Sequence, residues 1–170
     1  MYPNTALQTG VDYATKARPG AFVGVVPNAI DSVEFGENVT AGDVFTMGGA
    51  VVLDTDGGVR LPTTGDTVFE GFVTYKNDGI IDYTGYEEGG LYKSIPIIRF
   101  GRIYLPVKTG ETILVGDAIS LYIGAGADFN TIEKTPLAPG ANDISLTAQA
   151  VVAQNSEDGC VLVSIFQYIR

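Results

Sequence analysis

The 170 residues, 45% of them hydrophobic, are sufficient for one folded domain with a buried core. Twenty acidic residues against ten basic ones give a net charge of −10, which has the wrong sign for binding phosphate backbones, so we expect no nucleic-acid partner. The chain has no histidine and one cysteine, so it lacks the usual general base, the commonest zinc ligand and any internal disulfide, and we expect no enzymatic activity, no cofactor and no metal site.

The first segment, residues 1–20, shows no sustained period of 2 or 3.6 and predicts an extended arm, followed by a single β domain over residues 21–170. The arm is the least acidic part of the chain, so it is either an arm that lies on a partner or a frayed terminus. Its candidate contact residues are Tyr2, Leu7, Tyr13, Lys16 and Arg18.

No secretory signal and no membrane-spanning apolar stretch is evident in the sequence. We therefore expect a soluble protein that is made in the cytosol and has no membrane partner.

Short apolar runs in the first half predict strands over residues 22–26, 44–47, 51–53 and 67–75. The acidic loop at residues 54–58 lacks the spacing of a calcium-binding loop and is predicted to be a solvated hairpin turn.

A long loop is predicted over residues 76–90, and loops of this length are usually functional or make contacts. Three tyrosines lie in it or beside it, and two interpretations are open: they face a partner, or they close one end of the fold. These residues are Tyr83, Tyr86 and Tyr92.

The second half predicts strands over residues 95–98, 102–107, 119–123, 144–152 and 160–169. Pro96 and Pro106 place the first two at an edge or a bulge. The last strand contains Cys160, predicted to be a small buried hydrophobe, and is either buried on both faces or lies at a subunit contact. With no long helical period, we expect an antiparallel barrel or sandwich of about nine to twelve short strands.

Two stretches repeat the pattern Gly-Glu-x-(Val/Ile)-x-x-Gly-Asp at a constant offset, since 110 − 36 = 74. The repeat indicates an internal duplication with half-repeats at about 21–94 and 95–170, although two hairpins that merely share good turn chemistry would also explain it. In each copy the second glycine suits a positive φ and the aspartate suits turn amides. The turn residues are Gly36, Gly42 and Asp43 in the first copy and Gly110, Gly116 and Asp117 in the second.

One segment, residues 77–85, has some likeness to a motif of trimeric dUTP nucleotidohydrolases. Tyr83 directly follows Asp82 here, however, and the other motifs of that family have no counterpart. An isolated carboxylate without a nucleophile, a phosphate-binding loop or a metal site does not make an active site.

Several glycine and apolar positions together resemble the layout of capsid cement (decoration) proteins of tailed bacteriophages, over roughly residues 19 to 125. The matching stretches are Pro19-Gly20-Ala21-Phe22-Val23-Gly24, Val33-Glu34-Phe35-Gly36, Val39-Thr40-Ala41-Gly42-Asp43, Phe69-Glu70-Gly71-Phe72-Val73, Tyr86-Glu87-Glu88-Gly89-Gly90, Phe100-Gly101-Arg102-Ile103-Tyr104-Leu105-Pro106-Val107 and Val115-Gly116-Asp117-Ala118-Ile119. Residues 130–155 show no family pattern.

This resemblance implies a non-enzymatic virion protein on the outer surface of the expanded phage head. Its implied partners are the major capsid protein and further copies of itself, commonly in a homotrimer. The alternative function is a glycan- or receptor-binding β module on a virion surface, which needs clustered exposed aromatic side chains.

Overall fold

The computed structural model describes residues 18–23, 28–74, 86–87 and 94–166. Within these residues twelve strands pair in antiparallel fashion and no helix is present, which confirms the predicted all-β class. Consequently, no helix in this part of the chain could cross a membrane. The strands are β1 (Ala29–Glu34), β2 (Val44–Phe45), β3 (Ala50–Leu53), β4 (Val59–Arg60), β5 (Gly71–Val73), β6 (Tyr86–Glu87), β7 (Ser94–Pro106), β8 (Ile119–Tyr122), β9 (Thr131–Lys134), β10 (Asp143–Ser145), β11 (Ala150–Glu157) and β12 (Cys160–Phe166).

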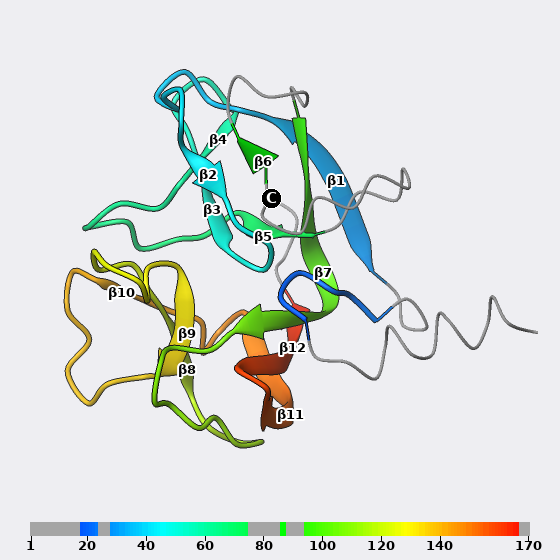
Figure 1. Ribbon diagram of the computed structural model, residues 1–170, viewed down its shortest axis with the longest axis vertical. Helices are drawn as coiled ribbons and strands as arrows, with labels where there is room; N and C mark the ends of the chain where they lie inside the picture. Colours follow the sequence, from blue (N-terminus) through cyan, green and yellow to red (C-terminus); the bar gives the residue numbers. More distant parts are fainter. Residues whose placement is uncertain (1–17, 24–27, 75–85, 88–93, 167–170) are drawn as a thin grey trace, which may run out of the picture.

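Strand β7 is the longest strand among the described residues and pairs with three others. Its first half pairs with β1 and β5, and its second half pairs with β12. In Figure 1 it runs from the end of the molecule that carries β1 to β6, here called the upper end, to the end that carries β8 to β12, the lower end. The largest sheet has the order β11-β12-β7-β5-β3-β4, with β1 also on β7. Phe35, which directly follows β1, bridges Val59 of β4, so the chain after β1 also contacts the far end of this path. The smaller sheets are β10-β8-β9 and β2-β6.

The two strands predicted at residues 95–98 and 102–107 are one strand of 13 residues, so the predicted break was wrong. A bend takes its place: Gly101 has a φ of 125°, and the register with β1 shifts beside it. Pro96 lies inside the sheet, opposite Ser32 of β1, and its carbonyl accepts a bond from the Thr74 N–H at 3.0 Å. In an antiparallel strand, the N–H and C=O of one residue point to the same neighbouring strand. The N–H that proline lacks would therefore point toward β5, which ends at Val73, so few strand hydrogen bonds are lost.

Three other predicted boundaries differ from the structure. Strand β1 was missed because its two clearly apolar residues, Ile30 and Val33, are three apart and do not alternate. The strand predicted at 144–152 is interrupted after β10, where the Ala150 N–H bonds the Leu146 carbonyl and begins β11. At 22–26 the described residues show only a bridge from Phe22 to Ile103, and residues 24–27 lie outside the described part.

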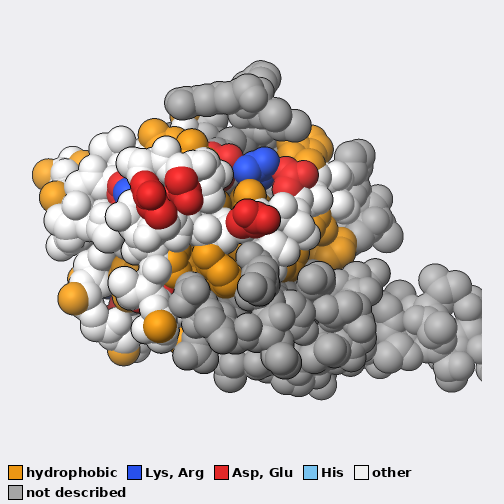
Figure 2. Space-filling model, turned by 90° about the horizontal axis from the view of Figure 1, so that it is seen from above, with side chains coloured by type: hydrophobic (Ala, Val, Ile, Leu, Met, Phe, Trp, Pro, Cys, Tyr) orange, Lys and Arg blue, Asp and Glu red, His pale blue; other side chains and the backbone are white. Residues whose placement is uncertain are grey.

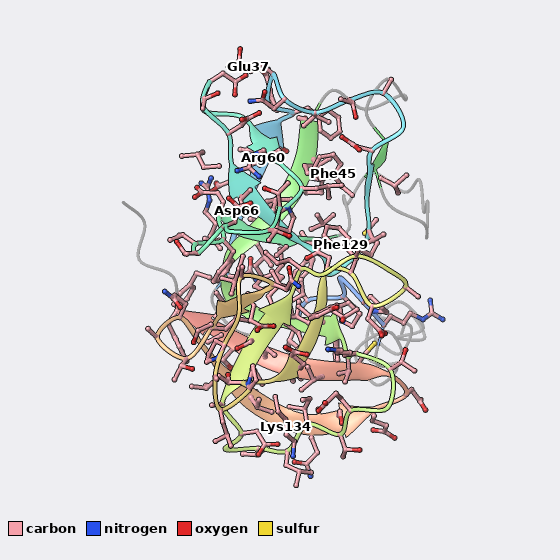
Figure 3. All side chains as sticks on the ribbon, turned by 90° about the vertical axis from the view of Figure 1, so that its left-hand side faces the viewer. Glu37, Phe45, Arg60, Asp66, Phe129 and Lys134 are labelled. Carbon is pink, nitrogen blue, oxygen red and sulfur yellow. The ribbon has the colours of Figure 1, made fainter. Side chains whose placement is uncertain are left out.

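A single buried cluster joins the two ends of the molecule. It contains Phe72 and Ile98 from the upper end together with Leu121 and Ile144 from the lower end. Phe129, which Figure 3 shows between the two ends, is partly buried against the same cluster. A second cluster fills the upper end; its buried members are Phe45, Met47, Val51, Val59, Val73, Ile95 and Ile97.

Asn130 adds a polar clip between the ends. Its Oδ1 accepts a hydrogen bond from the Ala50 N–H at 2.8 Å, and its Nδ2 donates one to the Ala50 carbonyl at 2.9 Å. The side chain therefore serves as a short strand partner for β3, 80 residues away in the sequence. Asn130 is buried and has a φ of 64°, a left-handed backbone conformation that Asn tolerates better than most residues.

Candidate interaction surfaces

Reactive chemistry is scarce in the described part of the chain. It contains no group of three or more His, Cys, Asp or Glu residues placed to hold a metal ion. Cys160 is buried, and desolvation together with nearby Asp158 raises the pKa of its thiol to about 11, so the thiolate is disfavoured. Asp82, the only catalytic carboxylate considered from the sequence, lies outside the described residues. The surfaces of the molecule are therefore the features to consider.

The two repeated Gly-Asp turns have the same geometry. Gly42 and Gly116 have φ values of 97° and 95°. Asp43 accepts a hydrogen bond from the Thr40 N–H at 2.9 Å, and Asp117 accepts one from the Leu114 N–H at 2.8 Å. The bond from Leu114 is the main reason why the pKa of Asp117 is lowered.

A third turn of this kind was not singled out in the sequence. Gly65 has a φ of 98°, and Asp66 accepts a bond from the Thr63 N–H at 2.7 Å. Asp66 also pairs with Arg60 through two bonds of 2.8 and 2.9 Å, and the two side chains lie together in Figure 3. Three turns thus share one chemistry, and the duplication predicted from two of them stays a prediction.

The first glycines of the two repeats have different roles. Gly110 has a φ of 83° and open space around it. Gly36 instead packs against the Asp54 side chain so closely that any Cβ would collide with it, and a Cβ on Gly58 would lie 2.7 Å from the Gly36 Cα. At Gly36 the requirement is therefore close approach rather than backbone conformation.

The acidic loop at residues 54–58 is more structured than the predicted solvated turn. Asp54 is buried, and its carboxylate accepts hydrogen bonds from the Asn38 side chain at 2.7 Å, the Asn38 N–H at 2.9 Å and the Thr55 N–H at 2.8 Å. The Asn38 side chain is the main cause of the lowered pKa of Asp54, followed by the Asn38 N–H. The prediction was wrong for Asp54 because the partner loop lies 16 residues away in the sequence.

Most of the interface residues proposed from the sequence lie outside the described residues. They are Tyr2, Leu7, Tyr13, Lys16, Tyr83 and Tyr92. Tyr86 belongs to β6, within the predicted long loop, and its backbone pairs with that of Phe45 in β2. Arg18 is half-buried at the start of the described segment.

The first described segment, residues 18–23, is joined to the sheet. The Gly20 N–H bonds the Tyr104 carbonyl at 2.8 Å, the Tyr104 N–H bonds the Ala21 carbonyl at 2.8 Å, and the Val23 N–H bonds the Arg102 carbonyl at 2.9 Å. Residues 20–23 therefore extend the sheet beside β7, on the opposite side from β12. Most of the predicted arm, residues 1–17, lies outside the described residues.

A partly apolar surface lies on the outward face of β7, β12 and β11, and sequence reasoning missed it. Phe100 lies opposite Phe166, while Arg102 and Val151 both lie opposite Ser164. Opposed residues in antiparallel strands share a face, so these side chains form one patch. Its members, the outer patch, are Phe100 (39% exposed), Val151 (49%), Phe166 (47%) and the exposed Arg102.

Carboxylates dominate the upper end. Figure 2, which looks onto the molecule from above, shows red Asp and Glu side chains gathered on the described part of this face with less blue from Lys or Arg. Glu34 and Glu37 are exposed here, as is Asp56 in the loop after β3. Such a surface repels DNA and other polyanions.

The fold has a counterpart among solved structures. No protein-family model matches the chain, and no curated protein matches it. The chain is similar to one chain of a structure titled "The capsid of Myoviridae Phage XM1", with a TM-score of 0.72 and 17% sequence identity. The match covers 89% of this chain and 91% of that chain, so the two share their fold over nearly their whole length.

Proposed function

We propose that this chain is a non-enzymatic structural protein of a phage virion that binds the outer surface of the expanded head and stabilises contacts between major capsid protein subunits. The observation that carries the proposal is the fold shared with a chain of a phage capsid structure over nearly its full length. The resemblance of residues 19 to roughly 125 to capsid cement proteins supports it.

The charge of the molecule suits that location. An exposed face rich in carboxylates stays soluble and does not attract the packaged DNA. The buried Cys160 thiol, with its raised pKa, adds no reactive group to a protein whose role is to bind.

The proposed mechanism is multivalent binding. The 17 residues that precede Arg18 would span about 60 Å if fully extended, and they start from a segment anchored on β7. An arm of that reach can cross a joint between neighbouring capsid subunits while the β domain contacts one of them. Self-association into a homotrimer would multiply these modest contacts, because each further contact becomes intramolecular.

Co-sedimentation with phage heads tests this function. The purified protein is mixed with expanded heads of its own phage that lack it, and with unexpanded heads as the control. We expect saturable binding at a fixed ratio to the expanded heads only. Absence of binding to either kind of head would contradict the proposal.

A truncation tests the arm separately. We expect removal of residues 1–18 to weaken binding to expanded heads while the β domain stays folded, because residues 20–23 that bond β7 are retained. Undiminished binding by the truncated protein would overturn the arm's part in the mechanism and leave the β domain as the binding element.

A further inference from the structure

We propose that the outer patch, formed by Phe100, Arg102, Val151 and Phe166, is the surface on which a second copy of this chain docks. The inference deepens the proposed function, because it rests on the self-association included there and assigns it to particular residues.

The outer patch lies on paired strands, which fix its backbone. Phe100 and Phe166 face each other across β7 and β12, and Arg102 donates a hydrogen bond from Nε to the Ser164 hydroxyl at 3.1 Å. Val151 completes the row on β11. Aromatic and apolar side chains presented in this way lose little side-chain entropy when a partner covers them.

The rest of the same sheet face is buried. Tyr104, Cys160 and Leu162 continue the face toward the lower end, and all three are buried, with the partly buried Ala21, Val23 and Ala153 packed against them. Beyond the row of Arg102 and Ser164, the two phenylalanines are 39% and 47% exposed. The outer patch is thus the exposed continuation of a buried surface, as expected for an interface core.

The charge of Arg102 indicates which partner binds the outer patch. Arg60, Arg99, Lys108 and Lys134 each pair with a carboxylate, whereas Arg102 has no carboxylate partner among the described residues. An exposed arginine beside two phenylalanines suits a partner that presents a carboxylate next to apolar atoms. A second copy of this chain does so, since it carries 20 acidic residues against ten basic ones and exposes carboxylates at its upper end.

The charge of Arg102 also indicates whether the contact is symmetric or head-to-tail. Two outer patches placed face to face around a two-fold axis would bring one Arg102 toward the other, and like charges disfavour that arrangement. The outer patch therefore meets a different, acidic surface on the next copy. Contacts of this head-to-tail kind form a ring where the rotation between copies closes, as in a cyclic oligomer.

Sedimentation equilibrium of the full-length protein tests this inference without any phage head. The variants are Arg102→Glu, which reverses the charge, and Val151→Ser, which removes an apolar side chain. Val68→Ser is the matched control, because Val68 is 52% exposed against 49% for Val151 and lies between β4 and β5. Far-ultraviolet circular dichroism and melting curves verify that each variant is folded.

We expect the wild-type protein to be oligomeric, Arg102→Glu and Val151→Ser to weaken association at least tenfold, and Val68→Ser to leave it unchanged. Added salt should weaken wild-type association, because Arg102 pairs with a carboxylate in it. A monomeric wild-type protein, or association that folded Arg102→Glu and Val151→Ser leave intact, would overturn the inference. A monomer that still binds expanded heads would overturn only the inference, whereas an oligomer that binds no heads would overturn only the proposed function.

Discussion

At the scale of single residues, Asn130 has the clearest structural role, because its side chain replaces a strand partner for Ala50. We expect Asn130→Ala to lower the free energy of unfolding by about 3 kcal/mol, since it leaves the buried N–H and C=O of Ala50 without partners. Urea unfolding at neutral pH measures this loss.

Two further variants separate the causes. Asn130→Gly removes the same hydrogen bonds but accommodates the φ of 64° without strain, so we expect it to lose stability too, somewhat less than alanine. Asn155→Ala removes an exposed amide that binds the Val115 N–H and should cost far less. An Asn130→Gly protein as stable as the wild type would show that the clip contributes nothing.

Asp54 gives a residue-scale prediction for pH. Hydrogen bonds from Asn38 lower its pKa in the folded protein below the ordinary value of 3.8. A lowered carboxyl pKa adds stability that is fully present above pH 3.8 and is lost as the pH falls through the folded-state value. We therefore expect the free energy of unfolding of the wild type to fall more steeply on acidification than that of Asp54→Asn, which has no carboxyl to protonate.

Urea titrations at several pH values between about 6 and 2.5 compare the two proteins over this window. The lowered pKa values of Asp66, Asp117 and Asp128 act in both proteins and cancel from the difference. Parallel curves for wild type and Asp54→Asn would show that Asp54 has no part in the acid response.

At the scale of elements, substitution of glycine by alanine should destabilise the turn at Gly42 less than the loop contact at Gly36. Gly42→Ala meets nothing within 4 Å, so only its φ of 97° opposes the change, at about 1 to 2 kcal/mol. Gly36→Ala forces its Cβ into the Asp54 side chain, and we expect a loss of about 3 kcal/mol. Urea unfolding measures both variants.

The acid response separates these two glycine variants further. Gly36→Ala should also reduce the steepness of the acid response, because it displaces the carboxylate that Asn38 holds, whereas Gly42→Ala should keep the wild-type steepness. Equal losses of stability and equal acid responses in the two variants would show that the two glycines act alike.

Some of these strands could be predicted from the sequence and others could not. The apolar alternation over residues 119–123 predicted strand β8, and the dense apolar run from Cys160 predicted a strand that is either buried on both faces or at a subunit contact. In the structure β12 is buried except at Phe166. The continuity of β7 could not be predicted, because Gly101 interrupts the apolar pattern between the two predicted strands. Pro96 in turn disfavours a central strand and is tolerated where β5 ends. Strand β1 depends on its pairing with β7 rather than on a pattern of its own.

The candidate surfaces were less accessible to sequence reasoning. The turn geometry at Gly42 and Gly116 is local, and so the residue types alone indicated it. The outer patch is not local: Phe100, Val151 and Phe166 are ordinary apolar strand residues, and nothing in their own pattern distinguishes them from Tyr104 and Leu162, which lie on the same face and are buried. The burial of Asp54 likewise depends on a loop distant in the sequence.

At the scale of the whole molecule, two regions carry the proposed contacts. Residues 20–23 and the outer patch both lie along the second half of β7, whereas Glu34 and Glu37 lie on the surface of the upper end. In the proposed arrangement, the outer patch joins copies to one another and residues 20–23 anchor the arm. One β domain would then link several capsid subunits through weak individual contacts.

The most direct test of this account is the temperature at which DNA-filled heads that lack the protein release their DNA, measured by access of a fluorescent dye with and without saturating protein. We expect a higher release temperature when the protein is bound. We also expect Arg102→Glu to give a smaller increase at equal occupancy, since copies that do not bind one another stabilise the shell less. Saturated heads that release DNA at the same temperature as bare heads would show that the protein binds the shell without stabilising it, and would contradict the central claim.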